Sequence, residues 1–179
     1  MVIAENSDDE EINNNNKFRL IKEIRNRNVK DRDLRGTDLR NASLFNADLS
    51  NTDLSNADLR GAFLMFAKLN SSNLNGSNLN RADLFSADLS NANLNNADLR
   101  GADLRSAELS NALLRNANLS QANFARADLT DVDFTNTKVT NTRFINNKGI
   151  TYSLKQDLIK RGAIFADAPG DRSATLTRV

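Results

Sequence analysis

The chain has 179 residues, with 24 Lys and Arg against 23 Asp and Glu, and its formal net charge is +1 at pH 7. This balance creates no strong field toward nucleic acid or anionic lipid, so neither is expected as a partner. The sequence contains no His and no Cys, which removes the commonest general base, the usual transition-metal ligands and any disulfide. We therefore expect no enzymatic site, no metal site and no cofactor.

The N-terminal part divides into a tail and a helix. Residues 1–16 are acidic and rich in Asn, and they are predicted to be a mobile tail. They lack the basic and apolar regions of a signal peptide, and no apolar run approaches the roughly 20 residues of a membrane span, so a cytoplasmic protein is expected. Residues 17–31 are predicted to form a helical cap, because Phe18, Ile21 and Ile24 recur at helical spacing.

The central segment, residues 32–146, carries an apolar residue at every fifth position. The residue two positions earlier is nearly always small, most often Ala. A period of five fits neither a helix nor a strand, but a chain that turns a corner once per repeat keeps every apolar residue inside. Four such sides make a square coil of about 20 residues. The expected interior residues are Leu at each fifth position from Leu34 to Leu119, then Phe124, Leu129, Phe134, Val139 and Phe144.

The consensus Ala-Asp/Asn-Leu-x-x, as in Ala57-Asp58-Leu59, resembles that of the pentapeptide repeat family. The Asn- and Ser-rich repeats look like those of the many family members found in cyanobacteria. The resemblance implies an all-β solenoid, a right-handed quadrilateral β-helix whose axis is filled by the Leu or Phe and the preceding Ala. The repeats cover 115 of the 179 residues, enough for about six coils spaced by roughly 4.8 Å.

Two outward features follow from the repeat. The positions after each Leu are polar or Gly, as in Arg60-Gly61, and Gly and Asn suit corners because both tolerate positive φ. The acids occupy the slot before each Leu and should point outward. They are interpreted as solvated ladders with Arg rather than as calcium ligands, for example in the pair Asp58 and Arg60.

The C-terminal part is predicted to close the rod. Residues 147–165 form a second helical cap in this interpretation, with a capping box at Ser153 and Gln156 and a helix stop at Gly162. Residues 166–179, which hold the only Pro, are predicted to be a second mobile tail.

One side of the rod carries most of the large apolar residues in outward slots. Because residue n stacks on residue n + 20, Phe45, Met65 and Phe85 should lie in one column, and Phe63 stands where most repeats have Asp or Asn. An exposed contiguous apolar patch usually marks an interaction surface. We call the following residues the apolar patch: Phe45, Phe63, Met65, Phe66 and Phe85.

The patch predicts a non-enzymatic scaffold that binds a protein partner or a second copy of the chain. Two alternatives keep it structural: the N-terminal segment, with Met1, Val2 and Ile3, covers the patch, or the rings only stabilise the rod. The family resemblance adds a further alternative, since some members resemble a B-DNA rod and bind DNA gyrase. That mimicry requires a strongly negative surface, which the balanced charge disfavours.

Overall fold

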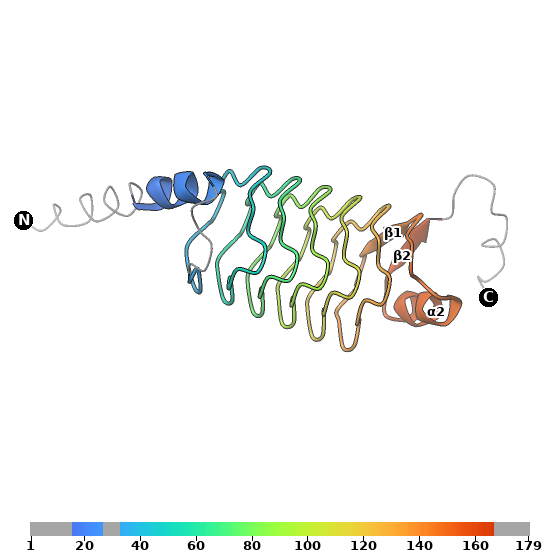
Figure 1. Ribbon diagram of the computed structural model, residues 1–179. Coiled ribbons are helices and arrows are strands. Elements are labelled where there is room, and N and C mark those ends of the chain that lie inside the picture. The colour runs from blue at the N-terminus through green and yellow to red at the C-terminus, as the bar shows by residue number, and fades with distance from the viewer. Residues whose placement is uncertain (1–15, 27–32, 167–179) are drawn as a thin grey trace, which may run out of the picture.

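The computed structural model describes residues 16–26 and 33–166, and within them a rod of stacked coils lies between two helices (Figure 1). Its order of elements after the coils is β1 (Arg143–Ile145), α2 (Tyr152–Lys160) and β2 (Ile164–Ala166). The predicted tails fall outside the described residues, except for residue 16, which is helical, and Ala166, which ends β2.

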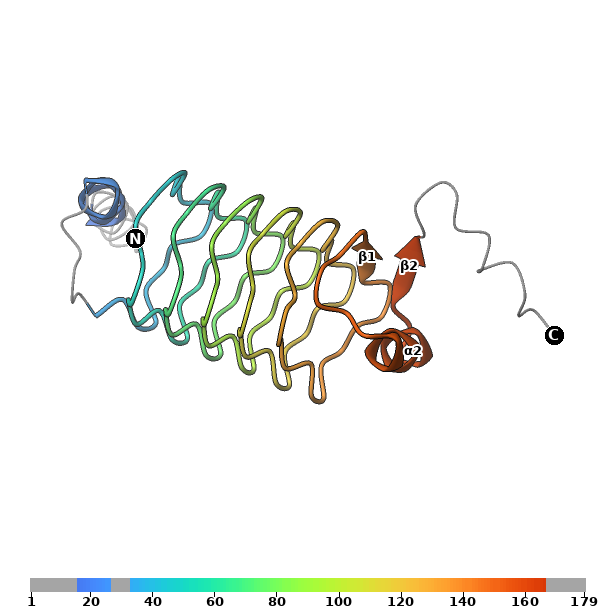
Figure 2. The same ribbon diagram turned by 45° about the vertical axis from the view of Figure 1, so that its right-hand side comes forward.

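The coils are built from 20 residues each. Parallel bridges join residue n to residue n + 20 along the whole rod, from Asp33 and Asp53 to Asp128 and Lys148. A turn recurs every fifth residue, so each coil has four sides, and successive coils follow one another along the axis in both views (Figure 2). The amide of Phe63, for instance, donates to Ala42 O at 2.9 Å. This register confirms the predicted coil of 20 residues.

The core is a stack of the predicted interior residues. Every apolar residue at the fifth positions from Leu34 to Phe144 is buried. The small residues two positions earlier share the axis, and most are buried. Ser72 Oγ donates to Leu69 O at 2.6 Å, whereas the buried Ser77 Oγ has no hydrogen-bond partner among the described residues. One large and one small side chain per side fill the narrow interior, because close packing tolerates neither voids nor crowding.

The corners explain the polar consensus. The second residue after each central apolar residue has a positive φ, and it is usually Asn, Gly or Ser. The Asp or Asn before the Leu closes the same turn, because its side chain accepts a hydrogen bond from the amide two residues later. Asp83 Oδ1 accepts in this way from the amide of Phe85 at 3.1 Å. The consensus acid is therefore part of the turn.

The N-terminal helix (residues 16–25) covers the first coil with a different face from the predicted one. Ile24 is fully buried and Leu20 and Ile21 pack on the core, but Phe18 is 72% exposed. The prediction for Phe18 was wrong because, at about 100° per residue, Leu20, Ile21 and Ile24 cluster on one side and Phe18 falls outside it.

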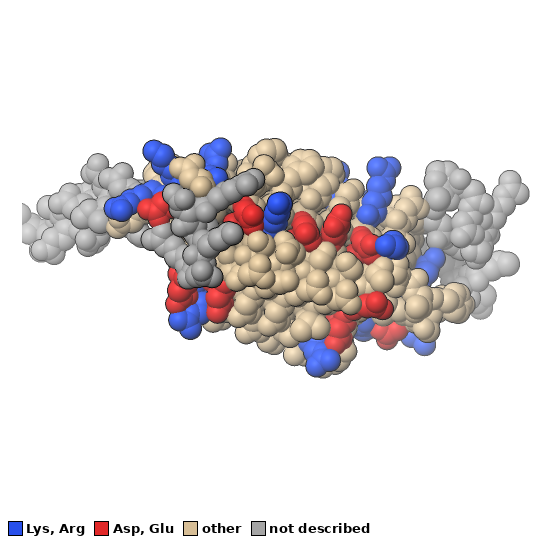
Figure 3. Space-filling view, viewed as in Figure 1, with Lys and Arg blue, Asp and Glu red and all other residues tan. Residues whose placement is uncertain are grey.

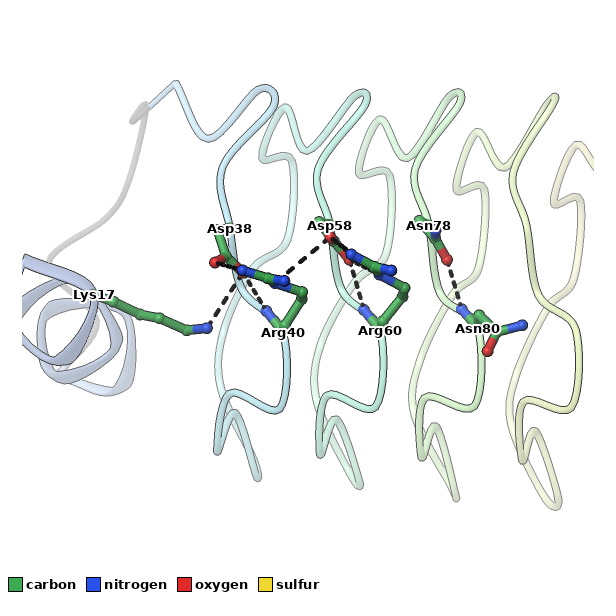
Figure 4. Close-up of polar contacts among 7 residues, drawn as sticks. All are labelled: Lys17, Asp38, Arg40, Asp58, Arg60, Asn78 and Asn80. Atoms are coloured by element: carbon green, nitrogen blue, oxygen red, sulfur yellow. Dashed lines mark hydrogen bonds and ion pairs between the residues drawn. The ribbon is translucent and has the colours of Figure 1, made fainter. Parts of the chain in front are cut away.

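A ladder of charges ties this helix to the rod (Figure 4). Lys17 Nζ lies 3.2 Å from Asp38 Oδ1, Asp38 also accepts from Arg40, and Arg40 Nε reaches Asp58 Oδ2 in the next coil at 3.7 Å. Arg60 continues the ladder with Asp58 at 2.6 Å. The predicted ion pairs are confirmed, and they run along one side of the rod.

Within the C-terminal cap, the helix begins two residues earlier than the predicted capping box. Thr151, not Ser153, is the N-cap of α2, because its hydroxyl accepts from the amide of Leu154 at 3.3 Å. Gly162, with φ of 93°, ends the helix as predicted. Ile159 stays 42% exposed, whereas Leu158 is fully buried.

The chain then returns to the rod as a strand that the sequence did not reveal. β2 pairs in parallel with β1, and the ring of Phe165 stacks on that of Phe144 at 5.0 Å between centroids. Phe144 in turn stacks on Phe124 at 5.4 Å. Arg161 supports this end, because its Nη1 donates to the carbonyl oxygens of Phe134 and Thr137. The backbone of the last coils is thereby covered, as a solenoid end requires.

Candidate functional site

The apolar patch lies on the outer surface of one side of the rod, as the register predicts. Phe45 and Phe63 are each 49% exposed and Phe66 is 46% exposed, whereas Met65 and Phe85 are half-buried. The backbone carries these residues in successive coils, since bridges join Ser43 to Phe63 and Phe63 to Asp83. These residues occupy repeat positions whose side chains point outward, because the narrow core holds only the central residue and the small residue two positions before it.

Three of the rings form one aromatic ladder. The ring of Phe66 stands edge-on to Phe45 and to Phe85, with centroids 5.7 Å apart in both pairs. Phe66, from the adjoining column, thus bridges the two rings that the sequence places 20 residues apart. Edge-to-face pairs of this kind are favourable for aromatic rings.

Phe66 also occupies an unfavourable backbone conformation. Its φ is 58°, in the left-handed region, where most equivalent corners of the rod have Asn, Gly or Ser. A bulky side chain there is an outlier, because the left-handed region costs an L-residue roughly 1–2 kcal/mol. Strained residues of this kind concentrate at functional sites.

Phe63 belongs to the patch through the backbone rather than through ring contacts. Ser43 and Asp83 flank it in the coils before and after, and its side chain takes the slot that usually closes the turn. Among the described residues, the amides of Phe45 and Met65 consequently have no hydrogen-bond acceptor, because neither Ser43 nor Phe63 provides one.

Sequence reasoning missed Arg105, which borders the patch. Its Cζ lies 5.6 Å from the centre of the Phe85 ring, and its Nη2 is 2.6 Å from Asp103 Oδ2. The signal was available, since residue 105 stacks on residue 85 in the same register. A guanidinium over an aromatic face is an attractive contact.

The face of the molecule drawn in Figure 3 carries both signs of charge, interspersed among uncharged residues. Hydrogen bonds from Arg100 hold the pKa of Asp98 below its ordinary value, and Arg60 does the same for Asp58. These carboxylates are therefore ionised and paired on the surface. The pairs leave no extended stretch of unpaired acids on these columns.

Outside the apolar patch, the described residues form a hollow but no cluster of metal ligands. No group of three Asp or Glu residues is placed to hold a metal ion in the segments that the structure describes. A hollow of about 810 Å³ lies between the last coils and α2, lined by residues that include Asp133, Thr137 and Arg161. It is remote in sequence from the apolar patch, and Arg161 is engaged there in capping the rod. In the described parts, no helix has the length and apolar character needed to cross a membrane.

The comparisons with solved structures give cyanobacterial and other relatives. HetL, a pentapeptide repeat protein involved in heterocyst differentiation regulation from Nostoc sp. strain PCC 7120, is 31% identical over 63% of this chain and 57% of HetL, with a TM-score of 0.37. The pentapeptide repeat protein alr5209 from Nostoc PCC 7120 is 33% identical over 61% of this chain and 84% of its own, with a TM-score of 0.41. QnrB1, a plasmid-mediated fluoroquinolone resistance protein, is 16% identical over 70% of this chain and 94% of its own, with a TM-score of 0.43.

Family membership rests on the repeats themselves. No curated protein matches the chain. The model of pentapeptide repeats matches in eight copies, over residues 28–61, 62–101, 82–120 and 107–144. These matches cover well over half of the chain and coincide with the coils whose central residues are buried. The chain is a member of the pentapeptide repeat family.

Proposed function

We propose that the protein is a non-enzymatic interaction scaffold, a rigid rod that binds a protein partner through the apolar patch. The observation that carries the proposal is the exposure of the Phe45, Phe63 and Phe66 rings, together with the strained backbone of Phe66, whose ring contacts that of Phe45. Such a corner is easily built from Asn or Gly, as elsewhere in this rod, so the stability of the fold does not explain a Phe there.

The proposed scaffold is a right-handed quadrilateral β-helix of about six coils, with a helical cap at each end. The register of 20 residues and the four turns per coil support this shape. Because each coil hydrogen-bonds to the next along the whole rod, groups on one side keep fixed positions relative to one another. A binding surface on such a rod is preorganised and loses little conformational entropy on association.

The experiment is an affinity capture from the source cell with a matched pair of variants. Phe63→Asp places a charge at the centre of the patch, and Leu113→Asp does the same in the equivalent slot of another side, where Leu113 is 40% exposed. Both changes put Asp where most repeats already have Asp or Asn, so both variants should fold.

The expected result is a protein that the wild type and Leu113→Asp retain and Phe63→Asp loses. Recovery of the same proteins in equal amount by all three chains would contradict the proposal. Purified wild-type protein should also bind the apolar dye ANS, and Phe63→Asp should bind less of it. If the dye binds only after residues 1–15 are removed, the patch is covered in the intact chain and the open surface is wrong.

A further inference from the structure

Two turns of the apolar patch lack the side-chain acceptor found in most turns of the rod, as do the turns at Asn70, Ser110 and Thr140 among the described residues. In most turns, the Asp or Asn before the central Leu accepts from the amide two residues later, as Asp83 does from Phe85. The patch has Ser43 and Phe63 in those two slots, and the amides of Phe45 and Met65 have no acceptor among the described residues. An occupant that buries the Phe45 amide must supply an acceptor to it, because a buried unpaired donor is unfavourable.

The same side of the rod carries a complementary acceptor one coil beyond the centre of the patch. Asp83 uses Oδ1 to close its own turn, and its Oδ2 has no hydrogen-bond donor among the described residues. Ser43 lies two coils away from Asp83 in the same column, with Phe63 between them. Along this column, one coil apart, lie Ser43 beside the unpaired Phe45 amide, then the Phe63 ring, then the Asp83 carboxylate.

This order is self-complementary under a two-fold rotation. If two rods lie antiparallel, face to face, about an axis that crosses the column at Phe63, then Phe63 faces Phe63 of the partner copy. Ser43 then faces Asp83 of the partner copy, and Asp83 faces the partner copy's Ser43. The neighbouring column obeys the same rule, since Met65 faces itself and Phe45 faces Phe85 of the partner copy. Equal coil spacing keeps these pairs aligned over three coils.

From this match we infer that the apolar patch binds a second copy of the chain in an antiparallel, two-fold symmetric dimer. The inference rests on the proposed function and names the occupant of its surface. The Phe and Met side chains form the apolar centre. The free oxygen of Asp83 reaches the Ser43 hydroxyl and the Phe45 amide of the partner copy. A centre of this kind needs a polar rim to reach the roughly 800 Å² per partner of a standard interface, and the charged columns beside the patch provide it.

Cross-linking tests the register directly, because the chain has no Cys of its own. A short bifunctional maleimide should join Phe63→Cys to itself, since that residue lies on the proposed axis. Phe45→Cys should not react with itself, but should be joined to Phe85→Cys when the two full-length variants are mixed. Leu113→Cys, in the matching slot of another side, is the control and should not cross-link. Efficient cross-linking of Phe45→Cys to itself would overturn the antiparallel arrangement.

Exchange of the two polar residues tests the contact between them. Light scattering after gel filtration should show that Ser43→Asp raises the dimer dissociation constant at least tenfold, because it sets carboxylate against carboxylate. The double variant Ser43→Asp with Asp83→Ser should restore dimerisation, since the pairs are re-formed in reverse. A double variant as weak as Ser43→Asp would overturn the contact.

Failure of the proposed dimer can be distinguished from failure of the proposed interaction surface. A wild-type chain that stays monomeric at several hundred micromolar would overturn the dimer. If Phe63→Asp then still loses a different protein in the affinity capture, the interaction surface stands and only its occupant is wrong. If Phe63→Asp loses nothing, both proposals fail.

Discussion

Phe66 and Phe85 are connected twice: the amide of Phe66 donates to the carbonyl oxygen of Phe85 at 3.0 Å, and their rings meet edge-on with centroids 5.7 Å apart. The backbone bond belongs to the stacking of coils and recurs throughout the rod, whereas the ring contact is local to the patch. The backbone of the rod therefore fixes where the side chain at position 66 lies, whereas the stacking of the coils does not depend on that side chain being Phe.

Phe66→Asn should change the unfolding free energy by less than about 1 kcal/mol. The loss of two edge-to-face contacts, each about 0.5–1.5 kcal/mol, is offset by relief of the left-handed backbone, which Asn tolerates. Phe66→Ala loses the same contacts without an Asn side chain suited to this corner, so it should be the less stable variant. Urea denaturation followed by circular dichroism measures both. An Ala variant more stable than the Asn variant would show that strain at this corner is unimportant.

Leu84→Ala should lower the unfolding free energy by about 2–5 kcal/mol, because a stacked core cannot collapse into the void. Leu84 is fully buried, and so is Ala87. Ala87→Leu should be at least as damaging through overpacking. Leu113→Ala, on an exposed side chain, is the control and should have little effect. Thermal midpoints show the differences, and unchanged midpoints for both core variants would contradict the packed axis.

The rod should lose stability in acid over a defined range. A hydrogen bond from Lys148 lowers the pKa of Asp128 from 3.8 to about 2, and one from Thr135, aided by Arg115, does the same for Asp133. Because these pKa values are depressed by folding, the stabilisation is present above about pH 4 and is lost as the pH falls toward 2. Denaturation midpoints measured from pH 6 to pH 2 should decline mainly below pH 4.

Lys148→Met isolates one of these contributions. It removes the ammonium that bonds to Asp128 at 2.7 Å, so the pKa of Asp128 should move back toward 3.8. Nuclear magnetic resonance of the carboxyl carbon reports that pKa directly. An unchanged value in the variant would mean that the pair does not form in solution.

The purified protein should not inhibit supercoiling by DNA gyrase at low micromolar concentration. A mimic of B-DNA needs a continuous negative surface, but the rod pairs Asp58 with Arg60, Asp98 with Arg100 and Asp103 with Arg105. A gyrase assay with plasmid DNA measures this, and clear inhibition would favour the DNA-mimic alternative over the scaffold.

The candidate site was predictable to the extent that the register was. A constant spacing of 20 residues is enough to predict from the sequence that Phe45, Met65 and Phe85 lie in one column, and the register confirms it. The bridging role of Phe66 was not predictable, since it depends on the direction in which a left-handed corner projects its ring. The unpaired amides of Phe45 and Met65 were not predictable either. They follow from the hydrogen bond by which the Asp or Asn of most turns accepts from the amide two residues later, and only the structure shows that bond.

The sequence alone determined the rod, because a narrow axis accepts one large and one small side chain per side and any other residue breaks the period. Every predicted central residue from Leu34 to Phe144 is buried for that reason. The ends were decided by the tertiary structure. A short helix has several possible apolar faces, and contact with the first coil selects the one that leaves Phe18 outside. At the other end, contact with the last coil places Phe165 in a strand over Phe144. Repetition specifies the interior locally, whereas the caps depend on contacts between segments that no repeat encodes.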